Sequence, residues 1–229
     1  MTMRKLDSSE LRHRLAQEAA RLMYKEEVKQ YFTAKRLAAK RLLGHGGHQK
    51  LRYRPQDLPS NGEIKDALLE LVRFQEGDLN QQRLFAMRVI ALETMRDLTP
   101  FQPRLIGSVS TGHVRKGSDI DLHVFTNSLE ELEHYLYYLG WRFETKRVTI
   151  KVASQFQDYT HILYERVFPI ELSIYPPEEI RLTHRSSTDG NPIVRVKPSV
   201  LEKLIAEQHP QEWEWYLTTG TILGLEQFE

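Results

Sequence analysis

The chain has 229 residues, a formal net charge of +1 and no cysteine, which excludes disulfides and thiolate zinc sites. No apolar run approaches the roughly 20 residues that a membrane-spanning helix needs, and the first residues lead into a charged segment, unlike a signal peptide. We therefore expect a soluble cytoplasmic protein without a membrane partner, long enough for one large domain or two small ones.

Four amphipathic helices are predicted before residue 98, because apolar residues recur there at helical spacing. Residues 8–43 hold the first two, and a shift of the periodicity at Thr33 makes this residue the expected cap of the second. A linker rich in Gly and Pro follows, and Ser60 or Asn61 is expected to cap the next helix. The third and fourth helices are predicted at 61–76 and 78–97.

A sheet with one inserted helix is predicted from Arg104 onwards, because short segments rich in Val, Ile, Thr and Tyr recur between turn residues. Asn127-Ser128 is expected to cap the helix, and Glu131 stands where a capping box needs a carboxylate. Pro176-Pro177 closes the sheet. The helix is predicted at 129–139, and strands are predicted at 142–152, 159–167 and 169–175.

The expected fold class is α/β (α+β), a mixed sheet with flanking helices that follows a helical region. After the sheet, a turn at 187–192 predicts a hairpin or flap, and Pro198 begins the last predicted helix. The chain is expected to divide into a helical, basic N-terminal region, a sheet-containing core, and a C-terminal flap with helices that pack on the core. These parts span 1–98, 99–178 and 179–229.

The small net charge conceals an asymmetry along the chain. Residues 1–60 contain 14 Lys or Arg and 6 Asp or Glu, whereas the rest of the chain contains 18 basic and 25 acidic residues. The first segment therefore carries +8 and the remainder −7. A basic arm joined to an acidic body is typical of a protein that touches something anionic. The alternative is that these cations only solvate the outer face of a helix.

The most informative stretch is a small-residue turn followed by a strand with two carboxylates. Gly107-Ser108 is followed, after about ten residues, by Ser118-Asp119-Ile120-Asp121-Leu122. Successive side chains of a strand point to opposite faces, so Asp119 and Asp121 share one face. Two adjacent carboxylates repel each other unless a cation lies between them, and a hard ion such as Mg²⁺ prefers oxygen ligands. The turn offers backbone N–H groups and a hydroxyl to a phosphate.

This string resembles the nucleotidyltransferase superfamily of DNA polymerase β. The superfamily pattern is an apolar residue, Gly-Ser or Gly-Gly, about ten residues, and then carboxylate–apolar–carboxylate–apolar. The fuller string from Gly107 to Gly112 is most similar to the branch of poly(A) and terminal uridylyl polymerases, and small bacterial nucleotidyltransferases share the core pattern. The residues that match are Ile106, Gly107, Ser108, Asp119, Ile120, Asp121 and Leu122.

The resemblance implies a polymerase-β-like sheet and transfer of a nucleoside monophosphate from an NTP to an acceptor hydroxyl, with Mg²⁺ or Mn²⁺ as cofactor. It also requires a third carboxylate on a neighbouring strand. Glu171 fits, because Ile170 and Leu172 alternate with it in a strand pattern, although the family more commonly has aspartate there. Glu165 and Asp158 are the competitors.

The family's roles transfer to this chain residue by residue. Asp119, Asp121 and Glu171 are the expected metal ligands and catalytic residues. His123 is expected on the carboxylate face as a neighbour of the metal site or a sheet-surface residue. The expected nucleotide-binding residues are Gly107 and Ser108 at the β- and γ-phosphates, Thr111 near the sugar, Lys116 at the leaving pyrophosphate, and Ser118.

The acceptor stays open at this point. An RNA 3′ end, a protein hydroxyl and a small molecule such as an aminoglycoside all fit the resemblance, and the basic arm with the Gly-Ser-Val-Ser-Thr-Gly string favours RNA. The alternative from a different class is a non-catalytic protein that senses a nucleotide or binds RNA or another partner with the same fold. The sequence does not specify an oligomeric state.

Overall fold

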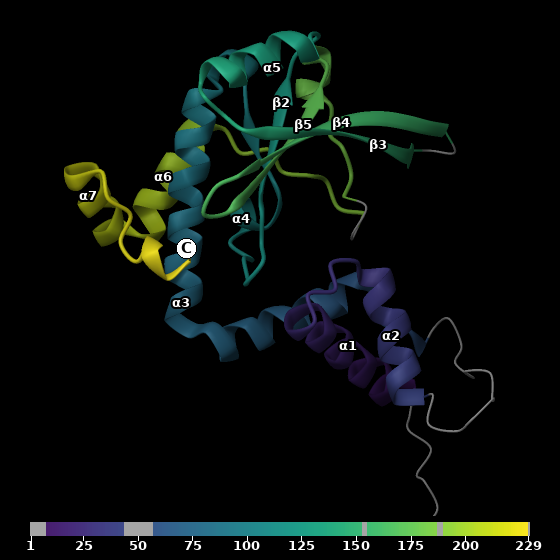
Figure 1. The fold of residues 1–229 in the computed structure, drawn as a ribbon. Helices are drawn as coiled ribbons and strands as arrows, with labels where there is room; N and C mark the ends of the chain where they lie inside the picture. Colours follow the sequence, from purple (N-terminus) through teal and green to yellow (C-terminus); the bar gives the residue numbers. More distant parts are fainter. Residues whose placement is uncertain (1–7, 44–56, 153–154, 187–189, 229) are drawn as a thin grey trace, which may run out of the picture. The chain divides into compact units, whose positions relative to one another are not determined.

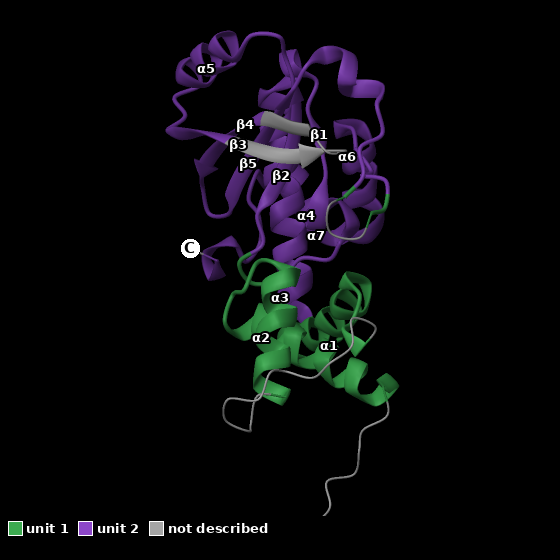
Figure 2. Ribbon diagram, turned by 90° about the vertical axis from the view of Figure 1, so that its right-hand side faces the viewer, with its two compact units in different colours: residues 1–77, 115–117, 186–191 green, residues 78–114, 118–185, 192–229 purple. Residues whose placement is uncertain are grey.

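The computed structural model describes residues 8–43, 57–152, 155–186 and 190–228, with side chains described outside 148–158. The chain forms two compact units (Figures 1 and 2). The first contains the residues up to Gly77 with the short segments 115–117 and 186–191, and the second contains 78–114, 118–185 and 192–229. The linker predicted after Leu43 lies outside the described residues as far as residue 56.

The first unit is a small helical bundle. Helix α1 (Ser8–Lys25) packs on α2 (Tyr31–Leu43), and the first half of α3 (Asn61–Asp97) completes a core rich in alanine. The two helices predicted within 8–43 are present, but the expected cap at Thr33 is wrong. The break falls earlier, at Glu27, whose left-handed backbone (φ 53°) ends α1, so Thr33 lies inside α2.

Helix α3 begins with a complete capping box. The Glu63 amide donates to Ser60 Oγ (3.1 Å), and the Ser60 amide donates to Glu63 Oε2 (2.7 Å), so Ser60 and not Asn61 is the capping side chain. The third and fourth predicted helices are the two halves of α3, which bends at Gly77 (φ 48°, ψ −124°).

The second unit is built on a five-stranded mixed sheet in the order β1-β2-β5-β4-β3. Strands β2 and β5 are parallel neighbours, and the other pairs are antiparallel. The predicted α/β fold with flanking helices is confirmed. The strands are β1 (Arg104–Leu105), β2 (Ile120–Phe125), β3 (Phe143–Val152), β4 (Gln155–Glu165) and β5 (Pro169–Tyr175).

Both ends of β4 differ from the strand predicted at 159–167, because it runs from Gln155 to Glu165, and the tertiary pairing explains the earlier start. Strand β4 begins at Gln155, earlier than expected, because it pairs with β3 along its whole length in a hairpin.

Helix α5 (Leu129–Tyr138) lies between β2 and β3 in the chain, and Ser128 Oγ caps it by accepting from the Glu131 amide (3.1 Å). The Ser128 amide donates to Thr126 Oγ1, so this cap is only half of the expected capping box.

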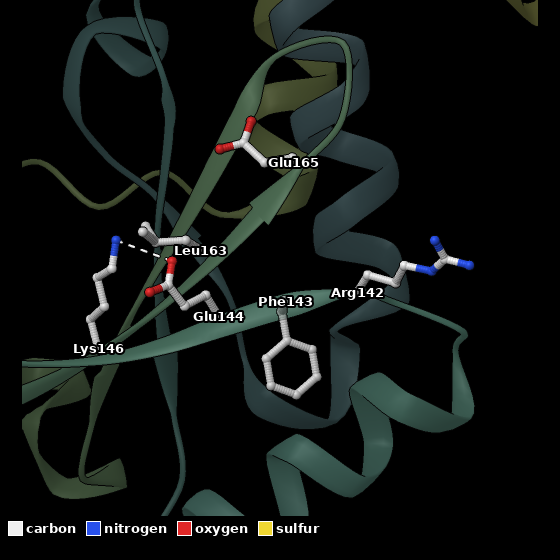
Figure 3. Close-up of a pocket in the computed structure, with 6 residues that line it drawn as sticks. All are labelled: Arg142, Phe143, Glu144, Lys146, Leu163 and Glu165. Carbon is white, nitrogen blue, oxygen red and sulfur yellow. Dashed lines mark ion pairs between the residues drawn. The ribbon is translucent and has the colours of Figure 1, made fainter.

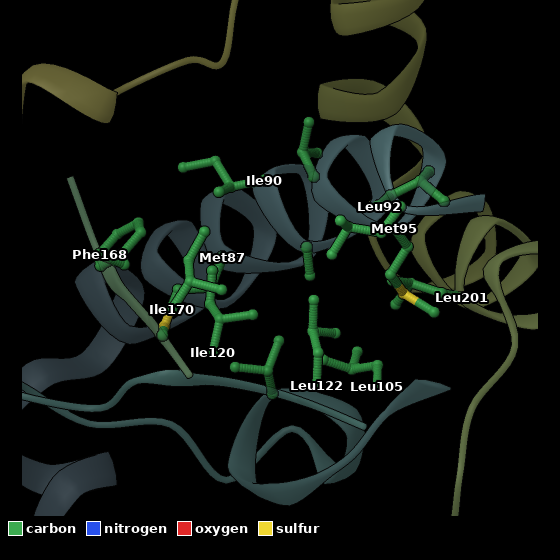
Figure 4. Packing of buried hydrophobic residues seen from close by; sticks show 14 of the residues in the cluster. Met87, Ile90, Leu92, Met95, Leu105, Ile120, Leu122, Phe168, Ile170 and Leu201 are labelled. Atoms are coloured by element: carbon green, nitrogen blue, oxygen red, sulfur yellow. The ribbon is translucent and has the colours of Figure 1, made fainter. Parts of the chain in front are cut away.

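One face of the sheet is covered by the second half of α3. Figure 4 shows Met87 of α3 directed towards Ile120 and Ile170 of the strands, and Ile90 belongs to the same buried cluster. Burial of each such side chain contributes about 1.5–3 kcal/mol relative to exposure. Because this face is filled by apolar side chains, the polar residues of β2 and β5 occupy the opposite face.

The C-terminal segment contains two helices where the sequence predicted one. After α4 (Gly107–Thr111) and the 3₁₀ turn η3 (Pro177–Arg181), the chain forms α6 (Pro198–Gln208) and α7 (Pro210–Thr219). Pro210 lacks an amide hydrogen and separates them. Trp213 is buried in a stack with Tyr216 (ring centroids 5.3 Å apart), so it packs into the core.

The segment after η3 returns to the sheet. The Ile193 amide donates to the His184 carbonyl (2.8 Å), and Val196 bridges Leu105 beside β1. Residues 187–189 of the predicted flap lie outside the described residues. No helix in the described part of the chain combines the length and apolar composition that crossing a bilayer requires.

Candidate active site

Two carboxylates stand at the start of β2 on the face that α3 leaves uncovered. Asp119 precedes the strand and Asp121 is its second residue, whereas the alternate residues Ile120 and Leu122 are fully buried in the core. The strand period of two therefore places both aspartates on the polar face. Their side chains are half-buried.

The third carboxylate comes from the neighbouring parallel strand. Asp121 and Glu171 are direct cross-strand partners in the β2–β5 pairing. One carboxylate oxygen from each of Asp119, Asp121 and Glu171 lies within 4.8 Å of the other two. Three half-buried anionic oxygens so close together fit the donor set of a hard divalent cation. The sequence favours Glu171 over Glu165 and Asp158. Glu171 joins the aspartates and Glu165 does not, whereas the Asp158 side chain lies outside the described residues.

The turn before β2 lies directly against the aspartates. The Ile106 amide donates to the Asp121 carbonyl (3.0 Å), and Gly107 begins α4 with a left-handed backbone (φ 70°). A Cβ on Gly107 would collide with Asp121 Oδ2. Only glycine satisfies both the backbone conformation and the close approach, which explains the small residue at this point of the sequence.

Helix α4 is held by its own hydroxyls and by a buried arginine. Ser110 Oγ and Thr111 Oγ1 both donate to the Gly107 carbonyl, at 2.8 and 3.2 Å. Arg88 of α3, only 1% exposed, donates to the Val109 carbonyl (3.3 Å). Burial lowers the pKa of Arg88 to about 10, so it stays charged at neutral pH. The sequence pattern did not predict the burial of Arg88, because a charged residue in an amphipathic helix is expected on the exposed face.

The remaining predicted nucleotide-binding residues occupy two places. Ser118 directly precedes Asp119 and is half-buried. Lys116 lies on the segment 115–117, which belongs to the first compact unit, and its amide donates to Glu76 Oε1 (3.1 Å). The Lys116 side chain is exposed.

His161 is a site residue that the sequence analysis missed. It lies on β4, and its Nδ1 is 2.5 Å from Glu171 Oε1 and 3.4 Å from Ser173 Oγ. The alternation of side chains along β4 predicts that His161 lies on one of the two faces of the sheet. It does not predict which of the two faces this is. It also does not predict the strand register, which places His161 opposite Ser173.

His123 shares the carboxylate face but is not on the sheet surface as expected. It is 2% exposed, and its Nδ1 accepts from Arg195 Nε (3.0 Å). Burial, with a smaller contribution from the charge of Arg195, lowers the pKa of His123 to about 3, so the ring is neutral at physiological pH. The Nδ1 of His123 therefore accepts a hydrogen bond from Arg195.

Arg195, on the segment that follows η3, contacts two aromatic rings of the sheet and the backbone that follows β5. Its guanidinium carbon lies 5.1 Å from the ring centroid of Phe125 and 5.6 Å from that of Tyr175, within the range of cation–π contacts. Burial raises the pKa of Tyr175 to about 12. The Arg195 Nη1 donates to three backbone carbonyls, those of Glu179 (2.7 Å), Ile180 (3.3 Å) and Leu182 (2.9 Å).

A shallow, open pocket of about 340 Å³ lies on β3 and β4. Leu163 lines it and is the cross-strand partner of Glu171, so the pocket adjoins the third carboxylate. Figure 3 shows Lys146 paired with Glu144 (3.2 Å), whereas Arg142 points away from the other lining side chains. The pocket is lined by Arg142, Phe143, Glu144, Lys146, Leu163 and Glu165.

The fold and the three carboxylates agree with a comparison to known families. Residues 91–188 match the family model of the nucleotidyltransferase domain. The match contains the whole sheet, α4 and the three carboxylates. The chain therefore carries a nucleotidyltransferase domain of the polymerase β-like superfamily, as the motif predicted. No curated protein and no solved structure matches the chain.

Proposed function

We propose that this protein transfers a nucleoside monophosphate from an NTP to an acceptor hydroxyl, with Mg²⁺ or Mn²⁺ as cofactor. The observation that carries the proposal is the meeting of Asp119, Asp121 and Glu171 within 4.8 Å in a nucleotidyltransferase domain. A divalent ion at these carboxylates would polarise the phosphoryl group and lower the pKa of the attacking hydroxyl. The three carboxylates would hold it.

The nucleotide is assigned to the α4 side of the carboxylates. Gly107 and Ser108 present backbone N–H groups and a hydroxyl to the β- and γ-phosphates in this proposal. The close approach of Gly107 to Asp121 supports it, because a phosphate bound at this turn would lie beside the Asp121 carboxylate and any cation that it holds. Thr111 is assigned to the sugar, Ser118 to the nucleotide, and Lys116 to the negative charge of the leaving pyrophosphate.

The acceptor then enters from the opposite side. Phosphoryl transfer aligns the attacking and leaving oxygens, so an acceptor must lie across the α-phosphorus from pyrophosphate. With α4 beside β2 on the β1 side, the opposite side is the surface of β5 and β4. Glu171 and the pocket around Leu163 lie there, and Glu171 is assigned to the acceptor hydroxyl.

RNA is the acceptor that the charge of the N-terminal region favours. Several arginines there are already paired, since Arg12 contacts Glu63 (2.7 Å) and Arg41 contacts Glu26 (2.8 Å). Arg36 and Lys40 of α2 are exposed. These two cations support an RNA contact, and a protein hydroxyl or a small molecule is the competing acceptor.

The test incubates the purified protein and Mg²⁺ with each of the four α-labelled NTPs in turn, together with RNA or a cell extract. Transfer predicts that label appears in one acceptor fraction and that pyrophosphate is released in equal amount. The labelled fraction identifies the acceptor class. Tight NTP binding without release of pyrophosphate under any condition would contradict transfer and favour a non-catalytic nucleotide sensor.

A further inference from the structure

Glu171 differs from the two aspartates in the length of its side chain. The extra methylene adds a rotatable bond, and the side chain is 32% exposed, so packing restricts it only partly. Misplacing a catalytic group by about 1 Å can cost about 100-fold in rate. A glutamate at this position therefore depends on a partner that restricts its carboxylate.

His161 has the geometry of such a partner. Strands β4 and β5 are antiparallel, with His161 opposite Ser173 and Leu163 opposite Glu171, so His161 is a diagonal neighbour of Glu171. Its Nδ1 lies 2.5 Å from Glu171 Oε1 and 3.4 Å from Ser173 Oγ. The imidazole is only 17% exposed, so the ring itself has little freedom.

We propose that His161 is a positioning residue for Glu171, which it holds in the orientation that brings the carboxylate to Asp119 and Asp121. The Nδ1–H group donates to Oε1 and removes the rotational freedom that distinguishes glutamate from aspartate. This inference rests on the proposed function, because it assigns a role within the same site. Metal-binding carboxylates are commonly hydrogen-bonded in this way, and loss of such a partner costs about 10- to 100-fold in metal affinity.

A purely structural histidine would behave differently. A cross-strand pair also stabilises the β4–β5 pairing, and that role changes stability without changing metal affinity. The chain offers a matched control, because His184 Nε2 lies 3.0 Å from Glu179 Oε2. This pair also brings an imidazole nitrogen close to a glutamate oxygen, but Glu179 is not one of the three grouped carboxylates.

The experiment measures Mn²⁺ binding by electron paramagnetic resonance, with a non-hydrolysable NTP present, for wild type and single variants. We expect His161→Ala to weaken Mn²⁺ binding by about 10- to 100-fold. His161→Asn should recover most of this loss, because its amide N–H can donate to Glu171. His184→Ala should bind Mn²⁺ like wild type. Thermal unfolding of each variant shows whether it is folded.

The decisive measurement is whether the effect of His161 on Mn²⁺ affinity depends on Glu171. If His161 acts only through Glu171, His161→Ala should cause no further loss of Mn²⁺ affinity in a Glu171→Gln background. Wild type that binds neither Mn²⁺ nor NTP would overturn the proposed function itself. Wild-type affinity in His161→Ala, or an equal loss in both backgrounds, would overturn only the role of His161.

Discussion

Asp121 contacts several other residues of the site. It is the cross-strand partner of Glu171, its carbonyl accepts from Ile106, and its carboxylate lies against Gly107. Its close neighbours Asp119 and Glu171 are both acidic. Repulsion between such groups disfavours the metal-free state, which gives the site a reason to bind a cation.

We expect Asp121→Ala to lower transfer by more than about 100-fold, because even residues that only support a metal ligand cost 10- to 100-fold. The midpoint of thermal unfolding without metal should stay equal or rise, since the substitution removes a repulsive carboxylate. Initial rates with labelled NTP and a melting curve check both parts. Near-wild-type transfer in this variant would contradict the metal assignment.

Gly107 allows a prediction with a built-in control. Gly107 and Gly140 both have a left-handed backbone (φ 70° and 76°), but an added Cβ meets Asp121 at Gly107 and nothing within 4 Å at Gly140. Each alanine substitution should cost about 1–2 kcal/mol of stability through backbone strain. Only Gly107→Ala should also lower Mn²⁺ affinity and transfer. Equal activity in the two variants, measured beside urea unfolding, would argue against the close approach.

At the scale of elements, the N-terminus of α3 carries the best-defined local contacts in the first unit. Ser60 and Glu63 cap each other, and Arg12 of α1 donates to both oxygens of Glu63 (2.7 and 3.0 Å). The hydrogen bond from Arg12, above all, lowers the pKa of Glu63 to about 2. The sequence predicted the cap, but it could not predict the long-range contact from α1.

Because of this lowered pKa, the stability that Glu63 contributes to the fold depends on pH. The folded-state pKa of Glu63 lies below its unfolded value of roughly 4.3, so the contacts stabilise the fold above about pH 4.3 and this stabilisation is lost as the pH falls through about 2. We expect Glu63→Gln to cost about 0.5–1 kcal/mol at pH 7, a modest value because the pair is partly solvent-exposed, and almost nothing below pH 2.

Hydrogen exchange of the amides in the first turn of α3, measured across pH, checks this prediction. Glu10→Gln is the matched control, because Glu10 pairs with Arg14 of the same helix on an exposed face (3.5 Å). It should change stability by less than about 0.5 kcal/mol at any pH. An equal effect of the two variants at pH 7 would contradict the special role of Glu63.

At the scale of the whole molecule, the charge is divided between the N-terminal region and the remainder. The division suggests an anionic partner, but ion pairs with Glu18, Glu26 and Glu63 compensate several arginines of that region. The predicted boundaries at 98 and 178 remain a proposal. What is established at this scale is a nucleotidyltransferase domain at 91–188 and two compact units.

If α2 contacts RNA, affinity should fall steeply with salt, because each phosphate contact releases condensed counterions. Charge reversal at the exposed Arg36 and Lys40 should lower RNA affinity and reduce the salt slope by about one per lost contact. NTP binding should be unaffected. Arg14→Glu on α1 serves as the control for added negative charge. A gel shift over a salt series measures this, and no shift even at low salt would exclude RNA.

Several local features of this protein follow from short stretches of its sequence. The period of a strand places Asp119 and Asp121 on one face, and Ser60 and Ser128 cap their helices. Each of these depends on residues a few positions apart, so the physical cause is readable in the chain.

The contacts between distant residues depend on how the strands and helices pack together. The parallel pairing of β2 and β5 brings Glu171 to Asp121, and the register of β4 brings His161 to Glu171. Register is set by how the apolar faces pack against α3 and not by local preference, and a slip of one residue would turn His161 to the other face. The buried Arg88 and the half-buried Arg195 acquire their partners only from that packing.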